Sequence, residues 1–140
     1  MWYIPPRDGP AGTEAPAEFV GTGYSGFGAG LNNPLYVLCR NDAGNSNCSG
    51  DAGPIPEVEW SIGPPQWDHP KGKPAFVLTP KSDIGMFNRD STPPFMIHGD
   101  DSCKCFTASG GCIVIPDRKT RIKIAAMIAA SGDRDLRVVP

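Results

Sequence analysis

The chain has 140 residues, a length typical of one domain with a hydrophobic core of its own. Its 17 glycines and 16 prolines are each about twice the average usage, while apolar residues are spread along the whole chain. This composition argues against disorder and favours a turn-rich β fold. The formal net charge of −2 gives no electrostatic basis for binding nucleic acid or an anionic membrane.

The N-terminal residues 1–17 are rich in proline and glycine and show no hydrophobic periodicity. We expect them to form a flexible arm, followed by one domain over residues 18–140. The start of the chain lacks the basic and apolar segments of a signal peptide. The apolar run at residues 124–130 is far shorter than the ~18 residues that a membrane span needs. We therefore expect no membrane span and no export through a signal peptide.

The body of the domain reads as short strands separated by turns. Residues 57–62 alternate polar and apolar side chains, as a half-buried strand does. Tyr24–Gly30 is glycine-rich but lacks the Gly-Lys-Ser/Thr ending of a phosphate loop, so we interpret it as a turn or bulge near the functional groove. His69 lies in a proline-containing loop over residues 63–74, and we interpret it as a surface residue. We predict strands at residues 18–20, 35–38, 57–62, 75–78, 95–97 and 136–139.

One helix is predicted near the C-terminus, from Arg118 to Ser131, with Asp117 as its N-cap and Gly132 as its C-cap. Its predicted buried stripe consists of Ile122, Ala125, Ala126 and Ala129, widened by Ile124 and Ile128. Many strands and a single helix predict a mostly-β fold, a sandwich or open barrel capped by a C-terminal α-helix.

A candidate Cys/His pair lies between residues 96 and 115. His98 ends one apolar run, and Cys112 begins another after Ser109-Gly110-Gly111. An imidazole at the end of one strand can accept the proton of a thiol at the start of another, and the thiolate is the nucleophile. The N–H groups of Gly111 and Cys112 could face a developing oxyanion, where one donor is worth roughly 3 kcal/mol. The alternative is that Cys112 is a small buried hydrophobe and His98 a structural core histidine.

The five cysteines fit two disulfides and one free thiol in an oxidising compartment, although five reduced thiols remain an alternative. Cys39 and Cys48 flank a turn-forming loop, and a bridge between them would stabilise the fold by roughly 2.5–3 kcal/mol. A direct bridge between Cys103 and Cys105 would be strained, and the sequence does not fix the pairing.

The segment His98-Gly99-Asp100, followed by a loop and by Ser109-x-Gly111-Cys112-Ile113, resembles the active-site signature of L,D-transpeptidases. The variant it resembles is found in peptidoglycan-targeting effectors of type VI secretion, and the resemblance extends over roughly residues 20–139. It implies the family's mostly-β fold, Cys112 as nucleophile, His98 as base, and Ser109 and Gly111 as the small residues before the nucleophile. Two positions depart from the wider family: Gly110 stands where a histidine is usual, and Ile113 and Val114 stand where a polar residue is usual.

The resemblance implies an enzyme that cleaves the L,D bond between diaminopimelate and D-Ala of peptidoglycan stem tetrapeptides through a Cys112 thioester. Water or a D-amino acid would accept the acyl group, without a cofactor or metal. The implied partners are peptidoglycan, an immunity protein and a carrier of the secretion machine, with action in the periplasm of a target cell. We expect substrate contacts from Tyr24, Arg89, Asp100 and Gly110, with Arg89 able to clamp a carboxylate. Asp100 could instead hold the loop or orient His98.

Two other functions remain open. His98, Cys103, Cys105 and Cys112 could bind zinc and stabilise a small binding module, although the Cys-x-Cys spacing is tighter than usual. The chain could also be a catalytically inert wall-binding domain that has kept the fold.

Overall fold

The computed structural model describes residues 19–26, 28, 31–32, 53–84, 94–102, 106 and 108–139. Several predictions therefore concern positions outside the described residues. These are the arm at 1–17, the strand at 35–38, and the roles of Cys39, Cys48, Arg89, Cys103 and Cys105.

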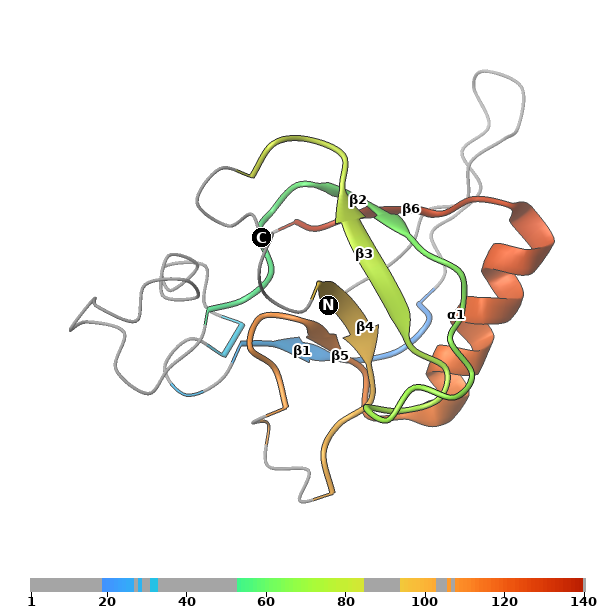
Figure 1. Cartoon of the computed structure of the whole chain (residues 1–140), viewed down its shortest axis with the longest axis horizontal. Helices are drawn as coiled ribbons and strands as arrows, with labels where there is room; N and C mark the ends of the chain where they lie inside the picture. The colour runs from blue at the N-terminus through green and yellow to red at the C-terminus, as the bar shows by residue number, and fades with distance from the viewer. Residues whose placement is uncertain are drawn as a thin grey trace.

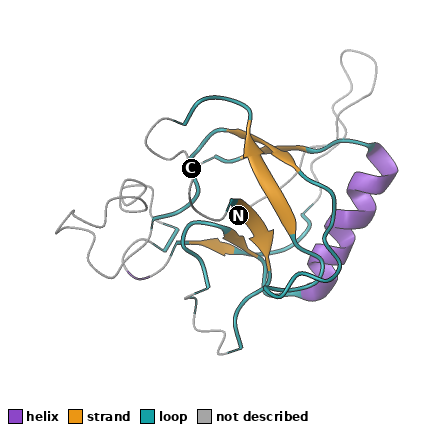
Figure 2. Ribbon diagram, in the orientation of Figure 1, coloured by secondary structure: helices purple, strands orange, loops and turns teal. Residues whose placement is uncertain are grey.

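The described strands form one six-stranded sheet in the order β1-β5-β4-β3-β2-β6. The sheet curls into a half-barrel, and a single helix packs beside it (Figures 1 and 2). This confirms the predicted mostly-β class with one helix, in its open-barrel form. The strands are β1 (Tyr24–Ser25), β2 (Glu59–Ile62), β3 (Phe76–Pro80), β4 (Phe95–His98), β5 (Ile113–Val114) and β6 (Asp135–Arg137), and the helix is α1 (Arg118–Ser131).

Four predicted strands, those at 57–62, 75–78, 95–97 and 136–139, are confirmed as β2, β3, β4 and β6 with shifted ends. The strand predicted at 18–20 is wrong for its two described residues, which lie outside any strand. Phe19 is 59% exposed, so its apolar side chain has no core to pack against. The sheet instead begins at Tyr24, which pairs with Val114 of β5.

Strands β4 and β5 are parallel, with Ile97 opposite Ile113 and His98 opposite Val114. The other strand pairs in the sheet are antiparallel. Parallel neighbours need a crossover connection, because the chain must return to the starting edge of the sheet. Residues 99–112 make this connection, which carries the segment between the predicted base and nucleophile.

Helix α1 has the predicted bounds and caps. The Asp117 carboxylate accepts hydrogen bonds from the backbone N–H groups of Lys119 and Thr120, and Gly132 ends the helix in the left-handed conformation with φ 71°.

The predicted buried stripe of the helix is partly wrong. Ile122 is 39% exposed, and Ala126 and Ala129 are exposed as well. The buried residues are Arg121, Ile124, Ala125 and Ile128. These positions follow i, i+3, i+4 and i+7 spacing, so the buried face is rotated toward an arginine that hydropathy does not mark as a core residue.

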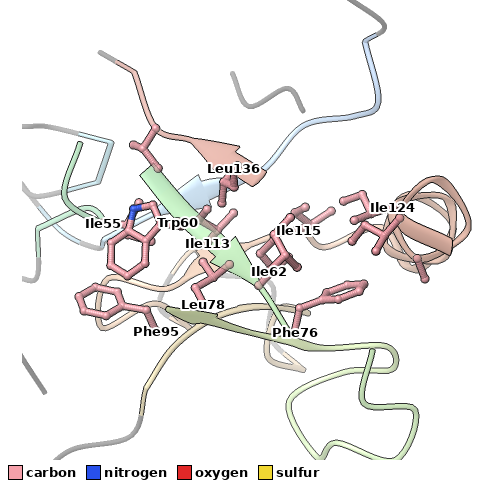
Figure 3. Packing of buried hydrophobic residues seen from close by; sticks show 14 of the residues in the cluster. Ile55, Trp60, Ile62, Phe76, Leu78, Phe95, Ile113, Ile115, Ile124 and Leu136 are labelled. Atoms are coloured by element: carbon pink, nitrogen blue, oxygen red, sulfur yellow. The ribbon is translucent and has the colours of Figure 1, made fainter. Parts of the chain in front are cut away.

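The main core fills the concave face of the sheet (Figure 3). Trp60 and Phe95 pack with ring centroids 4.9 Å apart, and Ile124 brings the helix into the same cluster. Side chains alternate between faces along a strand, and Met96 and Cys112 form a separate small cluster with Ala75. The sheet therefore has a second, smaller apolar patch on the face turned away from the main core.

Candidate functional site

His98 and Cys112 share one face of the sheet. Their neighbours Ile97 and Ile113 belong to the main core, whereas Cys112 and Met96 belong to the patch on the opposite face. Since His98 lies two residues after Met96, alternation places its side chain on that same face. The register offsets Cys112 from His98 by two residues on an adjacent strand, which puts their Cα atoms about 8 Å apart.

The imidazole of His98 is held as a neutral base. Its Nδ1 lies 2.6 Å from the carbonyl oxygen of Gly99, which can only accept, so Nδ1 carries the proton. This leaves Nε2 with a lone pair, and Nε2 is buried without a hydrogen-bond partner. Burial lowers the pKa of His98, partly opposed by its hydrogen bond to Gly99, and the positive charge of Lys71 lowers the pKa further. The ring is therefore neutral at pH 7, and the lone pair of its buried Nε2 has no hydrogen-bond partner.

Cys112 is a free thiol that is 6% exposed. Its Sγ lies 4.0 Å from the Pro94 carbonyl oxygen, at the outer limit for a hydrogen bond to sulfur. Because Nε2 of His98 has no hydrogen-bond partner, the thiol and the imidazole are not hydrogen-bonded in this conformation. Proton transfer between them requires Sγ to leave the Pro94 carbonyl.

The turn before Cys112 is fixed by the hydroxyl of Ser109, which is fully buried. Ser109 Oγ donates to the Cys112 carbonyl at 2.6 Å. It also accepts from the Gly111 N–H at 3.0 Å and from the Gly26 N–H at 2.9 Å. One side chain thus closes the turn on itself and joins it to the end of β1. The role of Ser109 in the structure is to position the residue that carries the thiol.

Ser25, for which the sequence predicted no role, also forms a hydrogen bond to this turn. Its Oγ donates to the Gly111 carbonyl at 3.2 Å and accepts from the Ile55 N–H at 2.8 Å. Ser25 is fully buried, so these bonds have no competition from water. The sequence shows only a serine in a glycine-rich segment, which does not reveal partners 30 and 86 residues away.

The two glycines before Cys112 differ in what they require. Gly111 has φ 100°, a conformation that side chains rarely adopt, whereas a Cβ at Gly110 would meet nothing within 4 Å. The Gly111 N–H already donates to Ser109, so it can serve an oxyanion only after that bond is exchanged. The oxyanion roles of Gly111 and Cys112 and the substrate role of Gly110 stay predictions.

Tyr24 and Asp100 hold the connection between β4 and β5. The Tyr24 hydroxyl donates to the Asp100 carboxylate at 2.7 Å and accepts from the Ala108 N–H at 3.3 Å. The Tyr24 ring also packs edge-on against Phe106, with centroids 5.2 Å apart. Burial, followed by the hydrogen bond to Asp100, raises the pKa of Tyr24. These contacts agree with the alternative in which Asp100 holds the loop, and substrate contacts from Tyr24 and Asp100 stay predictions.

Arg121 is a second residue that the sequence did not single out. It is 4% exposed, and its guanidinium donates to the backbone carbonyls of Pro74, Ile115 and Pro116. It therefore joins the loop before β3 to the segment between β5 and α1. These segments meet beside the N-terminal turns of the helix (Figure 1). The spacing of the buried stripe of α1 includes position 121, so it could have identified Arg121 if charged residues had been considered as members of the stripe.

His69 lies in the loop before β3, as predicted, where its Nδ1 accepts from the Lys71 N–H. Within the described ranges, no group of three or more histidine, cysteine or acidic residues is arranged to hold a metal ion. Of the proposed zinc ligands, only His98 and Cys112 belong to that part of the chain. No helix in the described part of the chain is long and apolar enough to cross a membrane.

Comparisons of the chain with protein-family models, with curated proteins and with solved structures found no match in any of the three.

Proposed function

We propose that the protein is a cysteine acyl-transfer enzyme in which Cys112 is the nucleophile and His98 the general base. One observation carries the proposal: a buried, neutral imidazole presents an unpartnered Nε2 on the same sheet face as a free thiol. A buried polar atom without a partner is uncommon and costs about 1–3 kcal/mol. A catalytic role explains why this cost is retained, because the lone pair must be free to take a proton.

The reaction proceeds in two halves. Nε2 of His98 takes the proton of the Cys112 thiol, and the thiolate adds to the carbonyl carbon of the substrate amide. The tetrahedral intermediate collapses with cleavage of the C–N bond, and the departing amine takes the proton from His98. The resulting thioester reacts with water to give a carboxylic acid, or with an amine to give a new amide. In both cases His98 removes the proton of the attacking group, and the thiol is restored.

For the substrate we propose the peptidoglycan stem tetrapeptide, cleaved between diaminopimelate and D-Ala, with possible exchange for another D-amino acid. The order of the motifs around His98 and Cys112 supports this choice, because it is similar to that of L,D-transpeptidase-like effectors of type VI secretion. The proposal includes action in the target-cell periplasm, neutralisation by an immunity protein, and delivery by a secretion carrier without a signal peptide.

The test is incubation of purified tetrapeptide muropeptides with the wild type, Cys112→Ala and His98→Gln, read by mass spectrometry with and without an added D-amino acid. We expect the wild type to produce tripeptide or the exchanged tetrapeptide. We expect Cys112→Ala to be inactive and His98→Gln to lose at least two orders of magnitude in rate. Unchanged tetrapeptide with the wild type, or equal turnover by Cys112→Ala, would contradict the proposal.

One observation favours a catalytically inert wall-binding module instead. Cys112 is 6% exposed, and its Sγ faces the Pro94 carbonyl rather than His98. The rate of alkylation by iodoacetamide under native conditions separates the two candidates. A reactive nucleophile is modified at a rate that falls in His98→Gln, whereas a permanently buried thiol is modified only as the protein unfolds.

A further inference from the structure

Arg121 is an uncommon residue in a small β domain, because it is a buried cation whose hydrogen bonds, among the described residues, all go to backbone carbonyls. Burial lowers its pKa, and the charge of Asp117, one turn earlier in the helix, raises it. Burying a charge without a directly bonded carboxylate is costly.

Arg121 lies next to Gly99, whose carbonyl oxygen bonds Nδ1 of His98, the candidate base. A Cβ placed on Gly99 would lie 3.1 Å from Nη2 of Arg121 and 3.1 Å from the Lys71 carbonyl oxygen. The Gly99 N–H donates to that same carbonyl at 2.8 Å. Gly72 has φ 120°, and a Cβ there would meet Gly99 at 2.8 Å. Arg121 Nη2 and the Lys71 carbonyl oxygen therefore both lie close to the same side of Gly99, where a side chain at position 99 would be crowded.

The same arginine holds the loop and the strand end that enclose Gly99. Its Nε donates to Pro74 O at 3.2 Å, which fixes the loop that supplies Lys71 and Gly72. Its Nη1 donates to Ile115 O, and the Ile115 N–H donates back to His98 O at 2.9 Å. Movement of the guanidinium would therefore displace the loop that bonds the Gly99 N–H and the segment that bonds the His98 carbonyl.

We propose that Arg121 is a positioning residue that holds the Gly99 carbonyl against Nδ1 of His98, so that Nε2 is the nitrogen that accepts the Cys112 proton. The catalytic half of this statement depends on the proposed function. The structural half, which concerns the tautomer of His98, does not. Arg121 touches neither reacting group and acts only through Gly99 and the backbone of His98.

The charge of Arg121 acts in the same direction as its hydrogen bonds. Among the described residues, the charges that act on His98 come from Lys71, His69 and Arg121, and each disfavours the imidazolium. Removal of Arg121 should therefore raise the pKa of His98 as well as release the Gly99 carbonyl. A lysine at position 121 would keep the charge but could not donate in the planar fork that reaches carbonyls of separate segments.

The test is NMR of ¹⁵N-labelled full-length protein, in which long-range ¹H–¹⁵N correlations identify which ring nitrogen of His98 is protonated. The variants are Arg121→Met and Arg121→Lys. Arg118→Met is the matched control, because Arg118 lies on the same helix and bonds Lys73 O at 3.2 Å but is exposed. We expect the wild type and Arg118→Met to protonate Nδ1. Both Arg121 variants should show mixed tautomers, and Arg121→Met should also show a raised His98 pKa. Muropeptide turnover should fall on the order of 100-fold in both, as expected for a misplaced base.

The outcomes separate the two proposals. A wild type that protonates Nε2, or folded Arg121 variants with the wild-type tautomer and titration of His98, would overturn the positioning role whatever the activity. If the Arg121 variants show the expected NMR changes but the wild type leaves muropeptides intact, the result would support the positioning role and contradict the proposed function. If Arg121→Met fails to fold, Arg121→Lys and the wild-type tautomer still decide the question.

Discussion

Replacing Ser109 by alanine tests how much the turn before Cys112 depends on one hydroxyl. The change removes three hydrogen bonds, those to the N–H groups of Gly26 and Gly111 and to the Cys112 carbonyl. Ser109 is fully buried, so water cannot replace its hydroxyl without opening the turn. Each buried polar group left unpaired costs about 1–3 kcal/mol, and partial relaxation brings the expected loss to about 3–5 kcal/mol. That is a large share of the 5–15 kcal/mol typical of a folded domain.

Urea unfolding at constant pH measures this loss as a lower midpoint with an unchanged slope. Ser131→Ala is the matched control, because Ser131 also bonds backbone groups but is exposed, and the change there should stay within about 0.5 kcal/mol. A Ser109→Ala loss below about 1 kcal/mol would refute the argument, since it would mean that the turn finds equivalent partners without the hydroxyl.

Two further predictions concern the same face of the sheet. Gly111→Ala should destabilise the protein by about 1–2 kcal/mol, because residue 111 has φ 100°. Gly110→Ala should be nearly neutral, because a Cβ there meets nothing within 4 Å. Urea midpoints compare the two variants, and equal losses of stability would contradict this reasoning. The lowered pKa of His98 means that the unfolded chain binds a proton more readily than the native state. The free energy of unfolding should therefore be greatest above the unfolded pKa of about 6.5 and decrease as the pH falls from there through the native pKa. His98→Gln should reduce this dependence in a series of urea midpoints, and an unchanged pH profile would show that His98 is not its source.

The sequence predicted the features that depend on neighbouring residues. The helix bounds followed from Asp117 and Gly132, because a side-chain N-cap and a left-handed glycine act within one turn. The placement of His98 at a strand end and of Cys112 at a strand start followed from two apolar runs.

The sequence could not predict the contacts that join distant segments. Ser25 and Arg121 act through partners that lie elsewhere in the chain, and neither the hydropathy of a strand nor that of a helix indicates where a hydroxyl or a guanidinium will find a carbonyl. The helix stripe was misplaced for the same reason, because Arg121 occupies a core position while Ile122 is 39% exposed. Buried polar residues follow hydrogen-bond geometry, which exists only after the strands are assembled.

The hydrogen bonds between the end of β1 and the turn before Cys112 also affect the order in which the protein folds. The hydrogen bonds from Gly26 to Ser109 and from Ser25 to Gly111 close chain loops of 83 and 86 residues, contacts of a kind that form slowly. The turn before Cys112 thus cannot acquire its native shape until the segment around Ser25 and Gly26 has docked against it. A newly made chain would carry the residues of the site but not its geometry, and any chemistry that depends on that geometry would begin only with the completed sheet.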